Sequence, residues 1–170
     1  MPDPEGASAK SGSLQYIARN TFAVIDSRSF PQIEAMLTTA DLPEWDRLQR
    51  GGSMLSADIA WCVQLSPGHA FTHWLLQGPG AEQADWGVLV ASDASFRPIR
   101  EHFRDLLEAT SPDGVRLRLR WYHGAVLRAL LPLCSPTQLR DFFGPVRAVG
   151  LRGPDHWNWM RVQEGRLVIT

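Results

Sequence analysis

The sequence predicts an α/β fold in which a largely parallel sheet is covered by helices and a β-hairpin ends the chain. Apolar runs of strand length alternate with segments of helical periodicity, as they do in strand–helix–strand units. These runs contain few polar residues, which is typical of strands buried on both faces. At 170 residues, with 44% hydrophobic and 21% charged residues, the chain has the composition of one globular domain.

Residues 1–13 are small, polar and rich in Pro, Gly and Ser, so they bury too little apolar surface to offset the entropy lost on ordering. They predict a flexible tail, followed by a single α/β domain over residues 14–170. Apolar runs within this domain predict strands over residues 21–25, 58–65 and 86–91. Apolar residues at helical spacing predict helices over residues 14–19, 30–40, 69–77 and 93–109.

The clearest strand signal lies in residues 115–122, where apolar side chains alternate with arginines and Tyr122. A helix is expected over residues 126–131. Ser135-Pro136-Thr137-Gln138 has the pattern of a capping box, and it opens a helix that runs through Phe143 and stops at Gly144-Pro145. Two strand-like runs around Gln163-Glu164-Gly165 predict a terminal hairpin over about residues 157–170.

Composition and cysteine pattern argue against several classes of function. Lys+Arg number 17 and Asp+Glu 18, a net charge of −1, so no overall basic excess attracts nucleic acid or an anionic membrane. No window approaches the ~18 apolar residues of a membrane span. Cys62 and Cys134 lack C-x-x-C spacing, and no phosphate-binding glycine loop follows a predicted strand. We therefore expect a reduced, cytoplasmic protein with no cofactor, no metal, no nucleic-acid partner and no membrane insertion.

Six motifs follow one another along the chain. They are an apolar strand that ends in Asp26 (21–30), a small-residue strand that ends in Ser92 (86–95), the triplet His102-Phe103-Arg104, the turn Ser111-Pro112-Asp113-Gly114, the arginine-aromatic segment LRLRWYHGAVLRALLPL (117–133) and a Phe-Phe-Gly-Pro stop with Gly144 and Pro145 (142–145). In this order, over about residues 14–149, they resemble the adaptor chaperones of bacterial type VI secretion, a family long described as a conserved domain of unknown function. That family usually has Asp-Pro-Arg after the tyrosine, where this chain has His123-Gly124-Ala125.

The resemblance implies a non-enzymatic adaptor that binds a toxin effector and helps to load it onto the VgrG spike. Arg116, Arg118 and Arg120 project from one face of the predicted strand at about 6.5–7 Å spacing and could grip acidic groups of such an effector. The alternative is a solvated face whose arginines pair with neighbouring carboxylates. Tyr122 and His123, at the end of this row, complete the candidate surface.

The terminal hairpin carries a second candidate surface. Trp157 and Trp159 are two residues apart on a strand, so they lie on the same face. That face either packs on the domain or stays exposed as an anchor for an effector or for a second copy of the protein. A homo-oligomer is therefore an open alternative.

An enzyme is the main alternative function. In a parallel sheet, Asp26, Ser92 and His123 would lie at strand ends that share one crevice, and they have the residue types of a catalytic triad. A small hydrolase of this kind would use Ser92 as its nucleophile, although residues 90–94 lack the glycines of a nucleophile elbow. The structural explanation is that Asp26 and Ser92 cap the turns or helices that follow them.

Two further alternatives stay open at this point. His69 and His73 are four residues apart on a predicted helix and could ligate a metal together with Cys62, although ordinary histidines explain the spacing more simply. The chain could also be an accessory subunit of another bacterial complex, with no preference for a toxin or a spike.

Overall fold

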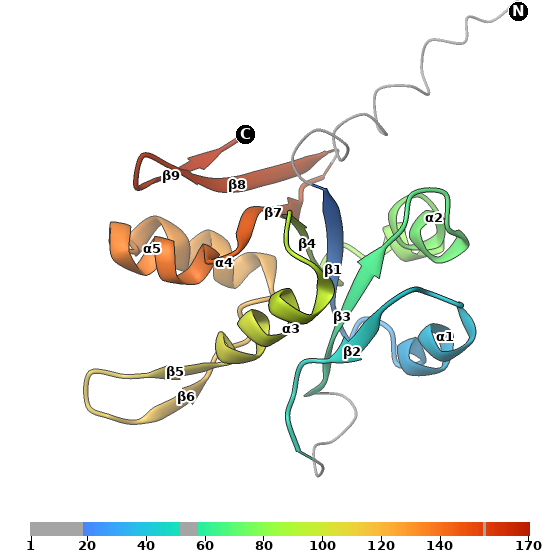
Figure 1. Cartoon of the computed structure of the whole chain (residues 1–170), viewed down its shortest axis with the longest axis horizontal. Coiled ribbons are helices and arrows are strands. Elements are labelled where there is room, and N and C mark those ends of the chain that lie inside the picture. Colours follow the sequence, from blue (N-terminus) through green and yellow to red (C-terminus); the bar gives the residue numbers. More distant parts are fainter. Residues whose placement is uncertain (1–18, 52–57, 155) are drawn as a thin grey trace, which may run out of the picture.

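The computed structural model describes residues 19–51, 58–154 and 156–170 (Figure 1). The expected tail over residues 1–13 and the expected helix over residues 14–19, apart from Arg19, lie outside the described residues. The strands are β1 (Asn20–Asp26), β2 (Trp45–Arg47), β3 (Ala60–Leu65), β4 (Gly87–Ser92), β5 (Glu108–Thr110), β6 (Arg116–Arg118), β7 (Val146–Arg152), β8 (Trp157–Gln163) and β9 (Arg166–Ile169). The helices are α1 (Ile33–Thr39), α2 (Ala70–Leu76), α3 (Phe96–Asp105), α4 (Gly124–Leu130) and α5 (Pro136–Phe143), with short 3₁₀ turns η3 (Pro79–Glu82) and η4 (Leu131–Leu133).

The main sheet is antiparallel, so the prediction of a largely parallel sheet was wrong. Its described strands lie in the order β2-β3-β1-β4-β7-β8-β9, and every neighbouring pair is antiparallel. The connection β3-α2-β4 does join two strands of the same direction, as alternating strands and helices suggest. However, β1 lies between β3 and β4 and runs opposite to both. Local periodicity carries no information about such an insertion.

Helices cover both faces of the sheet. This explains why the apolar pattern of its strands predicted a parallel sheet. Figure 1 shows α1 and α2 on one side of the sheet and α3, α4 and α5 on the other. Phe22 and Val24 of β1 point into the core beneath the second group, whereas Ala23 and Ile25 point into the core beneath the first. Because both faces of the central strands are buried, these strands lack the polar alternation of a half-exposed antiparallel sheet.

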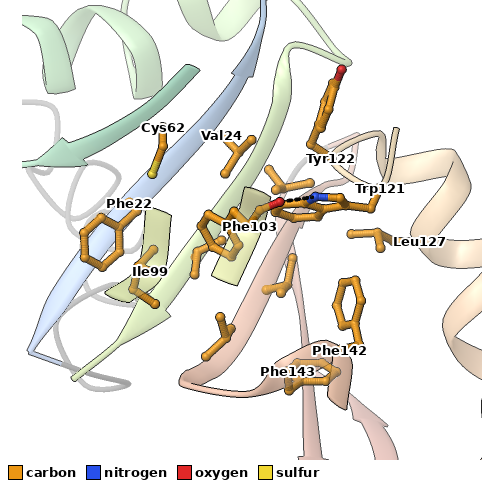
Figure 2. Packing of buried hydrophobic residues seen from close by; sticks show 14 of the residues in the cluster. Phe22, Val24, Cys62, Ile99, Phe103, Trp121, Tyr122, Leu127, Phe142 and Phe143 are labelled. Carbon is orange, nitrogen blue, oxygen red and sulfur yellow. Dashed lines mark hydrogen bonds between the residues drawn. The ribbon is translucent and has the colours of Figure 1, made fainter. Parts of the chain in front are cut away.

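Trp121 is the centre of the larger core (Figure 2). Its side chain is fully buried, with its ring centroid 4.8 Å from that of Phe103 and 5.9 Å from that of Phe142. The indole N–H donates to the backbone carbonyl of Phe103 at 3.4 Å. These contacts hold the chain segment after β6 against α3 and α5, because the aromatic rings bury a large apolar area.

Several predicted elements have different limits in the structure. The strand expected over residues 115–122 is paired only over Arg116–Arg118, because Trp121 and Tyr122 leave the ribbon and enter the core. The helix expected over residues 93–109 covers only Phe96–Asp105, and the chain then continues into β5. The strands β2 and β7 carried no clear sequence signal and were not predicted.

The capping box and the terminal hairpin were predicted correctly. The hydroxyl of Ser135 accepts from the Gln138 N–H at 3.2 Å, while the Gln138 side chain accepts from the Ser135 N–H at 2.8 Å. Strands β8 and β9 are joined by Glu164 and Gly165, which have positive φ angles of 51° and 74°. Two such residues are what a tight antiparallel turn requires.

Among the described residues, no helix combines the length and the apolar character that crossing a membrane would take.

We predict that Gly87→Ala strongly destabilises the fold. Gly87 has a φ of +148°, and a Cβ atom there would lie 1.8 Å from the carbonyl oxygen of Val24 on β1. Because β1 is packed on both faces and cannot move away, the substitution should lower the free energy of unfolding by more than about 3 kcal/mol. Urea denaturation followed by tryptophan fluorescence measures this.

Gly114→Ala is the matched control for that substitution. Gly114 also has a positive φ, +80°, but a Cβ atom there would meet nothing within 4 Å. Only the backbone strain of about 1–2 kcal/mol remains. Equal losses for the two variants would contradict the close approach of β1 and β4 at Gly87.

Candidate functional site

The residues of the six motifs gather at three places in the structure. The first is the buried carboxylate of Asp26 at the end of β1, whose side chain is 2% exposed. Its Oδ2 atom accepts from the Arg120 guanidinium at 2.8 Å, and Nε2 of His123 lies 2.9 Å from the same oxygen without the alignment of a hydrogen bond. Its Oδ1 atom accepts from the Arg28 backbone N–H at 3.1 Å. Both oxygens are therefore compensated, as a buried charge requires.

Tyr122 completes this Asp26 cluster. Its ring is buried, with its centroid 5.3 Å from the His123 ring and 5.9 Å from the Arg120 guanidinium carbon. The Arg120 Nε–H donates to the Tyr122 hydroxyl oxygen at 3.4 Å. Burial raises the pKa of that hydroxyl, and the neighbouring Arg120 charge opposes part of the increase. The cluster links the central strand to a segment 94 residues later in the chain.

The second place joins β4 and α3 to the turn between α5 and β7. The Ser92 hydroxyl donates to the Pro145 carbonyl at 2.6 Å and accepts from the Ala94 N–H at 3.0 Å. The His102 Nε2 atom lies 2.7 Å from the Phe142 carbonyl oxygen, to which its N–H donates. Gly144 has a φ of +48°, and a Cβ atom there would lie 2.6 Å from the His102 ring. The Gly-Pro stop therefore allows the imidazole to pack against the backbone.

The third place is the contact of α3 with the edge strand β2. The Arg104 guanidinium donates to the carbonyls of Arg47 at 2.9 Å and Leu48 at 3.2 Å, and it pairs with the Asp46 carboxylate at 3.1 Å. The Arg104 side chain is only 14% exposed. Arg100 pairs with the same carboxylate at 2.8 Å. At all three places the motif side chains bond to the protein's own backbone and carboxylates.

The three residues of the candidate triad are not brought together. The β1–β4 register pairs Ser92 with Asn20, at the opposite end of β1 from Asp26. Six residues of strand separate the two side chains by about 20 Å. Only His123 lies beside Asp26. The hydroxyl of Ser92 makes its hydrogen bonds to backbone groups, so these three residues form no nucleophile–base pair.

The candidate metal ligands are also apart. The His69 Nδ1 atom caps α2 by accepting from the Phe71 N–H at 3.1 Å. Cys62 belongs to the core on the other face of the sheet from α2, and burial raises the pKa of its thiol. Over residues 19–51, 58–154 and 156–170, no group of three His, Cys, Asp or Glu side chains is placed to hold a metal ion.

The two tryptophans of the terminal hairpin pack on the domain. Trp159 is buried, and its ring covers Gly150 so closely that a Cβ atom there would lie 3.0 Å away. Trp157 is half-buried, with its ring edge-on to Trp86 at 5.8 Å and beneath the Arg152 guanidinium at 5.7 Å. Of the two options that the sequence left open for this pair, the structure shows the packed one.

The remaining residues of the arginine row lie on a projecting ribbon, residues 108–118, which we call the arm. Strands β5 and β6 form it as a separate two-stranded sheet, and it extends beyond the end of α3 (Figure 1). Arg116 and Arg118 are exposed on it. A groove of about 630 Å³ runs between the arm and residues 48–50. The alternation of arginines and apolar residues in the arm predicted an exposed strand face. The other wall of the groove lies about 60 residues earlier in the sequence, and no sequence pattern indicated that the two would meet.

Comparison with known proteins gives one match. The model of a family described as a domain of unknown function, DUF4123, matches residues 21–141, which is over two thirds of the chain. The match begins in β1 and ends in α5, so it includes the Asp26 cluster and the arm. Neither the curated proteins nor the solved structures gave a match.

We predict that Asp26→Asn costs about 3 kcal/mol of unfolding free energy, because it removes the charge that compensates Arg120 in a largely buried place. The control is Asp58→Asn. Asp58 pairs with Arg28 at the surface, where their side chains are 36% and 53% exposed, so its loss should cost less than about 1 kcal/mol. Denaturation curves that coincide for the two variants would contradict the buried character of the Asp26 pair.

Alkaline titration tests the burial of Tyr122. The folded state favours the neutral hydroxyl, whose pKa is raised, so stability is unaffected below about pH 10 and falls as the pH rises through the raised pKa. The chain has two tyrosines, Tyr16 and Tyr122. Ultraviolet absorbance of tyrosinate should show a late ionisation that Tyr122→Phe removes. If the late ionisation persists in Tyr122→Phe, it belongs to Tyr16 instead.

Proposed function

This chain belongs to the DUF4123 family, and from that membership we propose that it is a non-enzymatic adaptor chaperone of a bacterial type VI secretion system. In this proposal it binds a toxin effector in the cytoplasm and helps to load that effector onto the VgrG spike. The family match over residues 21–141 is the observation that carries the proposal, because it includes the ordered motifs from Asp26 to the leucine-rich helix α4.

The geometry of the motif residues supports a binding module. Asp26, Ser92, His102 and Arg104 make their contacts to groups of the same chain, and they hold the sheet, α3 and the α5–β7 turn in fixed positions. Such joints make a rigid frame. A rigid frame lowers the conformational entropy lost when a partner binds, so it favours recognition by a preformed surface.

Co-expression tests this function. The tagged chain is produced together with the toxin and the spike protein encoded beside it, purified, and separated by size-exclusion chromatography at low and high salt. We expect a stoichiometric complex with the toxin, and a lower yield of soluble toxin when the chain is omitted. A complex that weakens at high salt would assign weight to charged contacts.

The opposite outcome would refute the chaperone function. A chain that elutes alone, shows the circular-dichroism spectrum of a folded protein and makes no difference to the solubility of the toxin is not its chaperone. The chain would then fit an accessory subunit of another complex. Gly87→Ala, which we expect to disrupt the fold, is the control for non-specific co-purification of the toxin with unfolded chain.

A further inference from the structure

We propose that the arm and its groove bind an extended, carboxylate-rich segment of the partner protein. This inference rests on the proposed function and names the surface and the chemistry by which the partner is held. Four observations carry it: the side-chain arrangement of the arm, the charge of the groove, the exposed aliphatic residues that alternate with the arginines, and the direction of the Arg116 backbone groups.

The register of the arm places its arginines on one face. Thr110 pairs with Arg116, and Glu108 pairs with Arg118. Because directly opposite side chains share a face, the two arginines, Thr110 and Glu108 all point to the same side. These four residues line the groove, together with residues from α3 and from the chain after β2. The arm's polar face is therefore one wall of the groove.

The groove carries an excess of positive charge. Its lining includes four arginines, at positions 50, 104, 116 and 118, and two carboxylates, those of Asp105 and Glu108. Two of these charges are already compensated, because Arg104 pairs with Asp46 and Glu101, and Arg50 pairs with Glu101 and Asp105. Arg116 is exposed, and the described residues include no carboxylate in an ion pair with it. A guanidinium in this position offers a planar pair of N–H donors, which matches the geometry of a carboxylate.

Exposed aliphatic side chains alternate with the arginines and point to the other face of the arm, and they favour a protein partner over a nucleic acid. Val115 is 55% exposed and Leu117 is 49% exposed, and they continue the apolar row that enters the core at Leu119 and Trp121. A phosphate backbone would neutralise the arginines but would leave these side chains in water. A peptide segment can supply both carboxylates and an apolar cover, which removes apolar surface from water.

The backbone of β6 can also take part. The Ser111 N–H donates to the Val115 carbonyl, and the Leu119 N–H donates to the Leu107 carbonyl. The backbone N–H and C=O groups of Leu117 therefore face β5, whereas those of Arg116 point away from it. Those groups are positioned to pair with an extended segment, as in recognition by strand addition.

The test measures the affinity of the purified chain for the toxin encoded beside it, by isothermal titration calorimetry at low and high salt. Arg116→Glu should raise the Kd by about tenfold at low salt and by less at high salt, since charged contacts are screened. Leu117→Ser should raise the Kd by about fivefold at both salt concentrations, because an apolar contact is not screened.

Arg97→Glu is the matched control. It makes the same change of charge at an exposed position in the first turn of α3, at the far end of this helix from the arm. An acidic residue is favoured there by the helix dipole, so the fold should be kept and the Kd should stay within about twofold of the wild type. Circular dichroism confirms that all three variants are folded.

The outcomes separate the two proposals. If the wild type binds the toxin and both arm variants bind as well as Arg97→Glu does, the arm is not the docking surface, while the adaptor function stands. If the wild type binds no toxin, the adaptor function fails, and a fluorescent peptide of alternating Glu and Leu tests the groove directly. Absence of peptide binding, binding unchanged in Arg116→Glu, or equal competition by a single-stranded oligonucleotide would overturn the inference.

Discussion

Both faces of β1 are covered by helices, and the rest of the structure depends on this constraint. It requires apolar side chains at successive positions of the central strands, so Phe22 and Ala23 belong to different cores although they are neighbours in sequence. A charged residue of β1 is tolerated only at the end of the strand. There, Asp26 accepts hydrogen bonds from the Arg120 guanidinium and the Arg28 backbone N–H. The same constraint also brings Gly87 against the β1 backbone, because two strands this tightly enclosed have no room for a side chain at that point.

Polar residues that are buried or largely shielded from solvent connect elements that are far apart in sequence. Asp26 holds the segment after the arm, Ser92 holds the turn before β7, and Arg104 holds the edge strand β2. Buried hydrogen bonds of this kind add little net stability, but leaving one partner unpaired is costly, so they specify one arrangement of the elements. The motifs that carry the family resemblance therefore describe the frame of the molecule. In the interaction proposed above, the partner contacts the arm, which projects from this frame.

Local structure could be predicted from the sequence, whereas the topology could not. The capping box at Ser135 and the terminal turn at Gly165 depend on a few adjacent residues, and both were found. The strand direction failed because a strand buried on both faces has the same apolar pattern in parallel and antiparallel sheets. Strand β7 follows directly on Gly144-Pro145 and contains Gly150, which obscured it. The pairing of Asp26 with Arg120 was missed because Arg120 reads as one more exposed arginine in a row and its partner lies 94 residues away.

The most direct test of the central claim, that a rigid frame presents the arm to an acidic partner segment, is hydrogen–deuterium exchange of the chain alone and in complex with the toxin. The account predicts new protection of backbone amides over residues 108–118 and 48–50, because the arm and the facing wall of the groove become covered. Amides of β1 and β4 should be protected equally in both states, since the frame does not rearrange. Protection confined to β8 and β9, with the arm exchanging as fast as in the free chain, would contradict the account.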